Sequence, residues 1–179
     1  MRGFTLVEVI IALLLAAIVC FIAIPSLRQY GSQTTDTVAQ SQLLQVIQRA
    51  QQTANAKMKS MALCPSRDGK TCVSDDANMV ILFTDNHNDG VIHDDAQLVS
   101  GVFLQGSGSL YLRSYPAYRD YLLMLPLALG SSDNGTFWYC SNDHVFQWAV
   151  TVSQSGEAHV VTSATEGGFL NAPGKRMEC

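Results

Sequence analysis

The chain has 179 residues, of which 15% are charged, and a formal net charge of −4 at pH 7. This length suits one domain with an additional segment and excludes two large domains. A dedicated nucleic-acid surface needs clustered Lys and Arg, whereas the basic residues here are scattered along a mildly acidic chain. A nucleic-acid partner is therefore not expected.

An apolar segment opens the chain. Residues 9–24 contain no charged residue, and the run extends back to Phe4 with only Thr5 and Glu8 as polar interruptions. A helix rises about 1.5 Å per residue, so ~20 residues cross the ~30 Å hydrocarbon core of a bilayer. We predict a single transmembrane helix over residues 4–25.

Three ordinary interpretations of this segment compete. It is long for a secretory signal, and Glu8 near its start is badly placed for one. A lipoprotein signal acylated at Cys20 would need a small residue where Val19 stands. A plain anchor leaves Glu8 unexplained, because an ionisable group in hydrocarbon costs several kcal/mol and usually marks a function. A glutamate that reaches the membrane interface without a partner is the remaining alternative.

Residues 3–9 read Gly-Phe-Thr-Leu-Val-Glu-Val and resemble the type IV prepilin signature. The resemblance implies a leader of residues 1–3, cleavage after Gly3 by a prepilin peptidase, and N-methylation of Phe4. It also implies that the Phe4 amine of a neighbouring subunit neutralises Glu8 in the filament, which fixes the register between subunits. Pro25 then kinks the helix, as in many pilin-like proteins, with termination of the membrane helix as the alternative.

A second helical pattern follows the apolar segment. Six apolar residues recur at spacings of four, three, four, four and three: Leu43, Ile47, Ala50, Ala54, Met58 and Met61. This spacing predicts an amphipathic helix over residues 26–62 whose apolar stripe packs against a sheet.

Residues 63–179 have the character of strands. Runs rich in β-formers predict strands at Met79–Phe83, Leu98–Leu104, Leu110–Leu112 and Thr136–Cys140, and a hairpin of Phe146–Val152 with Glu157–Thr162. Pro126 makes residues 122–129 an edge strand or a loop. Residues 166–179 read as a loop. A long N-terminal helix packed on an antiparallel sheet is an α+β fold, and it is also the general pilin plan.

Four cysteines lie in this strand-rich region, and an exported region makes disulfides the default use. Of the three possible pairings we favour Cys64–Cys72, whose loop contains a turn-forming Asp-Gly pair, and Cys140–Cys179, which would hold the C-terminus on a strand. Zinc is the alternative use, but the chain has no C-x2-C pair and its histidines lie far away in sequence.

Four segments resemble the GspH/FimT branch of minor pilins and pseudopilins: residues 63–72, 81–90, 135–140 and 149–156. This resemblance implies a structural minor pilin or pseudopilin of a type IV pilus or a type II secretion pseudopilus. It implies a single-pass inner-membrane protein with a periplasmic head, whose partners are other pilins, through the N-terminal helix, and the prepilin peptidase. Residues 107–132 match no segment that we can name.

A ligand- or DNA-binding subunit at a filament tip is the alternative function. Some pilus members of this branch bind DNA through Gly-Arg-x-Arg after the last strand. Here the corresponding residues are Gly156-Glu157-Ala158-His159, so that both arginines, and with them the phosphate contacts, are missing. DNA uptake by this route is therefore not expected.

One metal-like motif stands out. Asp85-x-His87-x-Asp89-Gly90 resembles the start of a calcium loop and makes Asp85 and Asp89 candidate ligands. Position three is a histidine and position twelve is Ala96, and a hairpin turn closed by Asp89-Gly90 is the alternative. The histidines at 87, 93, 144 and 159 show no metal-binding spacing. We expect neither a cofactor nor an enzymatic activity.

Overall fold

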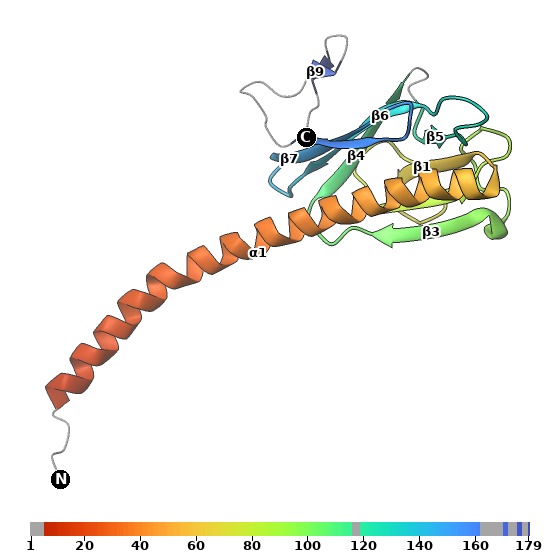
Figure 1. The fold of residues 1–179 in the computed structure, drawn as a ribbon. Coiled ribbons are helices and arrows are strands. Elements are labelled where there is room, and N and C mark those ends of the chain that lie inside the picture. Colours follow the sequence, from red (N-terminus) through yellow and green to blue (C-terminus); the bar gives the residue numbers. More distant parts are fainter. Residues whose placement is uncertain (1–5, 116–118, 162–169, 172–174, 177–178) are drawn as a thin grey trace.

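The computed structural model describes residues 6–115, 119–161, 170–171, 175–176 and 179. One helix, α1 (Leu6–Lys57), leads into a region of antiparallel strands (Figure 1). We use the word head for residues 36–161, which comprise the strands β1 to β8 and the part of α1 that packs on them. The predicted α+β class is therefore confirmed.

Two four-stranded antiparallel sheets make up the head. The first sheet has the order β3 (Leu98–Phe103), β2 (Met79–Thr84), β1 (Met61–Ser66), β5 (Leu122–Met124). The second has the order β4 (Ser109–Tyr115), β6 (Asn134–Cys140), β7 (Phe146–Val152), β8 (Ala158–Val161). A one-turn 3-10 helix, η1 (Asp95–Gln97), precedes β3, and β9 (Leu170–Asn171) pairs with β10 (Lys175–Arg176).

The predicted strands all form, and β5 is an edge strand, as Pro126 indicated. The predicted hairpin is β7 with β8, closed where the Ser153 N–H donates to the Glu157 oxygen (2.9 Å). The prediction of a single sheet is incomplete, because the strands divide between two sheets. Residue 162 and most of the predicted C-terminal loop lie outside the described residues, and the described part contains the short pair β9 and β10.

The prediction that the amphipathic helix runs to residue 62 is wrong at its end. The helix stops at Lys57, and Met58 takes a left-handed backbone conformation with φ of 51°. The Lys59 N–H then donates to the Ala54 oxygen (3.3 Å), which is the six-to-one hydrogen bond of a Schellman cap. Met61 therefore belongs to β1 and not to the helical stripe.

Strand β1 was missed because it contains Pro65, which usually marks a loop or an edge. The Pro65 oxygen accepts a hydrogen bond from the Val73 N–H (2.9 Å) and so points away from β2. The nitrogen and oxygen of a strand residue face the same side, so the missing Pro65 donor also faces away from β2. On that side β5 pairs only with Met61–Leu63, and no ladder hydrogen bond is lost.

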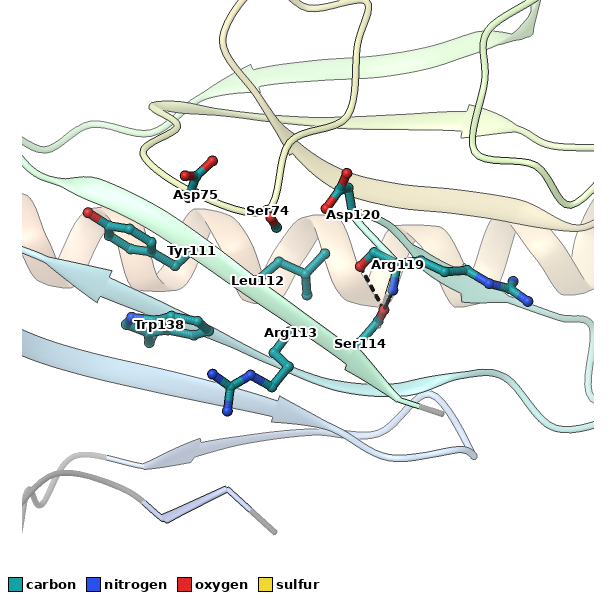
Figure 2. A pocket seen from close by; sticks show the side chains of 9 residues that line it. All are labelled: Ser74, Asp75, Tyr111, Leu112, Arg113, Ser114, Arg119, Asp120 and Trp138. Carbon is teal, nitrogen blue, oxygen red and sulfur yellow. Dashed lines mark hydrogen bonds between the residues drawn. The ribbon is translucent and has the colours of Figure 1, made fainter. Parts of the chain in front are cut away.

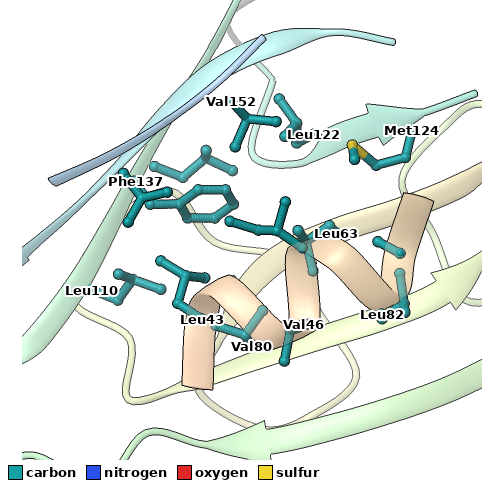
Figure 3. Packing of buried hydrophobic residues seen from close by; sticks show 14 of the residues in the cluster. Leu43, Val46, Leu63, Val80, Leu82, Leu110, Leu122, Met124, Phe137 and Val152 are labelled. Carbon is teal, nitrogen blue, oxygen red and sulfur yellow. The ribbon is translucent and has the colours of Figure 1, made fainter. Parts of the chain in front are cut away.

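The core of the head lies between the helix and both sheets (Figure 3). The stripe residues of α1 that follow the predicted spacing are fully buried: Leu43, Ile47, Ala50 and Ala54. They meet side chains of the first sheet, such as Leu63 and Leu82, and of the second sheet, such as Phe137 and Val150. The second half of α1 is thus the central element of the head, which shares its core with two sheets at once.

Candidate functional site

The N-terminal part of α1 projects away from the head (Figure 1). We call residues 6–18 the apolar segment. In the single chain its large apolar side chains are exposed to solvent, for example Leu6 at 77% and Leu13 at 65%. A contiguous apolar surface of this size marks a site that contacts lipid or other protein. Among the described residues, no helix has both the length and the mean hydropathy that a membrane span requires.

Glu8 lies in the first turn of α1, exposed among the apolar side chains of Leu6, Val7 and Val9. A carboxylate is favourable there because the first turn carries the positive end of the helix dipole. Gly3 and Phe4, the predicted cleavage junction, lie outside the described residues. The predicted span from Phe4 to Pro25 and the pairing of Glu8 with a Phe4 amine stay predictions.

Pro25 is part of α1, and the helix continues past it to Lys57. The alternative that proline ends the helix is therefore excluded. Figure 1 shows α1 curved between its N-terminal end and the head. The apolar segment and the core stripe consequently belong to one continuous helix.

The first disulfide joins Cys64 of β1 to Cys72, with 5.5 Å between the Cα atoms. Inside the loop, Asp68 accepts hydrogen bonds from the main-chain N–H groups of Lys70 and Thr71, both at 2.8 Å. These hydrogen bonds, led by the one from Thr71, hold the pKa of Asp68 well below its ordinary value. Gly69 has φ of 76°, which a turn of this shape requires. Bridge and turn together fix the loop that follows β1.

The second disulfide joins Cys140, at the end of β6, to Cys179, with 5.7 Å between the Cα atoms. Both favoured pairings are thus present, and Cys20 belongs to neither. Cys140 is buried against Trp138 and Ala149 on the face of the second sheet that points away from α1. The last residue of the chain is in this way attached to the head.

The calcium candidates play different parts in the connection between β2 and β3, residues 85–97. Asp85 is 1% exposed, and its two oxygens accept main-chain hydrogen bonds from Asp89 (3.2 Å) and Gly90 (2.8 Å). Asp85 therefore shapes the loop from within. The alternative of a hairpin turn closed by Asp89-Gly90 is wrong, because thirteen residues, those of η1 among them, separate the two strands.

The same loop brings His87, Asp89 and His93 together. One ligand atom from each lies within 4.8 Å of the others, and all three residues are exposed. The sequence spacing of the histidines gave no indication that His87 and His93 lie together. Two loop histidines six residues apart carry no periodic signal, and only the H-x-D-x-x-x-H pattern itself could have suggested the cluster.

Residues 156–159, where the resemblance predicts that the DNA-binding arginines are missing, cover the turn into β8 and its first two residues. Gly156 has φ of 80°, and the exposed side chains of Glu157 and His159 approach each other at 3.7 Å. The carboxylate of Glu157 at this turn supplies no contact that would favour a phosphate.

Sequence reasoning missed a shallow pocket of about 260 Å³ over the outer face of the second sheet (Figure 2). Tyr111 of β4 stacks on Trp138 of β6, with 5.4 Å between the ring centroids, and the Arg113 guanidinium lies 5.8 Å from the Trp138 ring. Asp75 and Asp120 also line it, so charges of both signs surround the rings. The alternation of Tyr111 and Arg113 along one strand was the available signal.

Comparison with known proteins gives one motif and three solved structures, two of which are of the same protein. The model of the prokaryotic N-terminal methylation motif matches residues 1–24, which confirms the predicted signature. No curated protein sequence matches the chain. The fold is similar to the type IV minor pilin FimU of Pseudomonas aeruginosa, at 16% identity and a TM-score of 0.49, over 75% of this chain and 90% of that one. It is also similar to the minor pseudopilin EpsH of the Vibrio cholerae type 2 secretion system, at 16% identity and a TM-score of 0.45, over 72% and 96%.

Proposed function

We propose that this chain is a structural minor pilin or pseudopilin, assembled through its N-terminal helix into a type IV pilus or a type II secretion pseudopilus. One observation supports this most strongly. The methylation motif of residues 1–24 opens a helix whose apolar segment is exposed and whose second half is the core of the head. A protein built in this way needs other copies of such a helix, or lipid, to cover the apolar segment.

The processing step follows from the motif. A prepilin peptidase would remove residues 1–3 and methylate the amine of Phe4. The new N-terminus keeps a positive charge after methylation and lies four residues before Glu8. Before assembly the apolar segment would lie in the inner membrane with the head in the periplasm.

Assembly then rests on Glu8. In a bundle of apolar helices an ionised carboxylate without a partner is strongly unfavourable, whereas a cationic Phe4 amine of the adjacent subunit compensates for its lost hydration. Only one axial offset between two helices brings these groups together. The pair would therefore set the register of the subunit in the filament.

The head supplies the exposed surface of the subunit. Its two disulfides and its helix-centred core suit a protein that works outside the cytoplasm, where disulfides persist. The residues at the position of the DNA-binding arginines give no support to DNA uptake, and we expect no binding of DNA to the full-length chain even at low salt.

Mass spectrometry of the mature N-terminus tests the processing. We expect a chain that begins at N-methylated Phe4 when a prepilin peptidase is present and at Met1 when the enzyme is absent. A chain that keeps residues 1–3 in assembled filaments would overturn the proposal.

Exchange of Glu8 tests the assembly. We expect Glu8→Gln to be processed normally but to enter sheared filaments at least tenfold less than the parent, because the partner of the Phe4 amine is lost. Glu157→Gln makes the same chemical change on an exposed turn of the head and serves as the matched control. Equal incorporation of both variants would contradict the role of Glu8.

A further inference from the structure

We propose that His87, Asp89 and His93 form a binding site for a divalent transition-metal ion, with Zn²⁺ as the representative ion. Three donor atoms, two imidazole nitrogens and one carboxylate oxygen, lie within 4.8 Å of one another. The site is independent of the proposed role in filaments, because it uses neither α1 nor the motif at the N-terminus.

The geometry of the ligands favours a single ion. His93 Nε2 lies 2.9 Å from Asp89 Oδ2, and the rings of His87 and His93 are edge to face with centroids 5.1 Å apart. Ligands at about 2.0–2.2 Å from a zinc ion lie ~3 Å or slightly more from each other, so small side-chain rotations suffice. The ion would replace the hydrogen bond between His93 Nε2 and Asp89 Oδ2.

The loop around the three ligands is already fixed by contacts that do not involve them. Buried Asp85 accepts the main-chain N–H of Gly90, and the Tyr121 hydroxyl donates to the Asn88 oxygen (2.7 Å). Gly90 has φ of 72°, and a Cβ there would collide with the ring of Tyr121. The loop thus closes on Tyr121 with no room for a side chain at position 90.

An outer contact also orients one of the ligands, Asp89, directly. Oδ1 of Asp89 accepts the Val91 N–H (3.0 Å), which leaves Oδ2 directed at His93. The Gln97 side chain accepts the main-chain N–H of His93 (2.7 Å), which holds the backbone of His93 beside η1. Hydrogen bonds that orient metal ligands in this way raise metal affinity, typically by tenfold or more.

The donor set indicates the class of ion. Imidazole nitrogens suit Zn²⁺, Ni²⁺ and Cu²⁺, whereas Ca²⁺ prefers oxygen ligands throughout. Three protein ligands on an exposed loop leave at least one coordination position for water. The loop starts beside the end of α1, where the Asp85 N–H donates to the Ser60 oxygen (2.9 Å), far from the N-terminal end of the helix (Figure 1).

Calorimetric titration of the full-length chain in detergent with Zn²⁺ tests the site. We expect one saturable Zn²⁺ per chain, and at least a tenfold weaker dissociation constant in His87→Ala and in His93→Ala. His159→Ala is the matched control, because His159 also lies beside a carboxylate, at 3.7 Å, but has no third ligand among the residues that the structure describes. Binding by the double variant His87→Ala/His93→Ala that equals the parent would overturn the site, as would no saturable binding by the parent.

The variant Asp89→Asn and the ion Co²⁺ test the site in ways that do not depend on whether the histidine variants fold. Asp89→Asn retains an oxygen that can accept the Val91 N–H but removes the charge, and we expect it to bind Zn²⁺ at least tenfold more weakly. The absorption spectrum of bound Co²⁺ should lack a thiolate charge-transfer band. Such a band would assign the ion to Cys20 and would refute the loop site.

Discussion

The indole Nε1 of Trp148 donates a hydrogen bond to the main-chain oxygen of Asp36 at 2.9 Å, across 112 positions of the chain. Trp148 is in β7, and Asp36 lies on α1 where the helix enters the head. The indole also stacks on Tyr139, with ring centroids 5.0 Å apart. This contact joins the second sheet to the helix ahead of the apolar stripe, which begins at Leu43.

Replacement of this tryptophan tests the junction. We expect Trp148→Phe to lower the free energy of unfolding by about 1–3 kcal/mol, because a buried hydrogen bond and part of a buried ring are lost. Denaturation of the full-length chain in detergent, followed by circular dichroism, measures the effect. Trp138→Phe makes the same exchange on the face of the sheet that points away from α1, and a larger loss there would contradict the assignment.

Asp36 makes stability depend on pH. Burial raises the pKa of its carboxyl group above the ordinary value, and Oδ1 is buried without a hydrogen-bond partner among the described residues. The folded chain therefore holds this proton more tightly than the unfolded chain. The contribution of protonated Asp36 to the free energy of unfolding is complete below the pKa that Asp36 has in the unfolded chain. It is lost as the pH rises through the higher pKa that Asp36 has in the folded chain.

We accordingly expect Asp36→Asn to be more stable than the parent at neutral pH, by about 1 kcal/mol, and to lose this advantage towards ~pH 4. Unfolding curves at both pH values measure the difference. Asp143→Asn, an exchange on an exposed turn, should change neither curve. An advantage of Asp36→Asn that grows as the pH falls would show that the sign is wrong.

The two disulfides should differ in their contribution to stability. Cys64 and Cys72 are separated by 8 positions, whereas Cys140 and Cys179 are separated by 39. The loop-entropy model then gives about 2.5 kcal/mol for the first bridge and about 4 kcal/mol for the second. Denaturation of the paired Cys→Ala variants measures both, with Cys20→Ser as the control outside the bridges, and the reverse order would contradict the model.

The end of α1 offers a stabilising exchange. Met58 has φ of 51° and is 52% exposed, so its side chain gains little from packing while its backbone is in a conformation that glycine adopts without strain. We expect Met58→Gly to raise the free energy of unfolding by about 0.5–1 kcal/mol. Met58→Ala keeps the Cβ atom and should bring no such gain, so equal values for the two variants would speak against this account.

Most of the fold could be predicted from the spacing of apolar residues in the sequence. Leu43, Ile47, Ala50 and Ala54 repeat with the period of a helix because one face of α1 is buried, and that period is visible without a structure. The same spacing wrongly predicted that the helix includes Met58 and Met61. Met58 takes a left-handed conformation and ends the helix, although the apolar spacing continues to Met61. Local backbone geometry, which periodicity does not encode, decided that boundary.

The candidate sites divide in the same way. Glu8 is conspicuous in the sequence because a charge interrupts an apolar run. His87 and His93 meet only because Asp85, Gly90 and Tyr121 fold the loop between β2 and β3, and contacts of that kind have no period. The pocket at Tyr111 and Trp138 likewise depends on which strands become neighbours.

The continuity of α1 has a mechanical consequence. The helix that carries the apolar segment is also the central element of the head. A pulling force on the N-terminal end of α1 therefore acts on the contacts of Leu43 and Ile47 with both sheets. The helix is continuous from Leu6 to Lys57, so the force passes along it to the head. The head should resist extraction as a unit, and its mechanical failure should begin with the helix sliding out of the sheets.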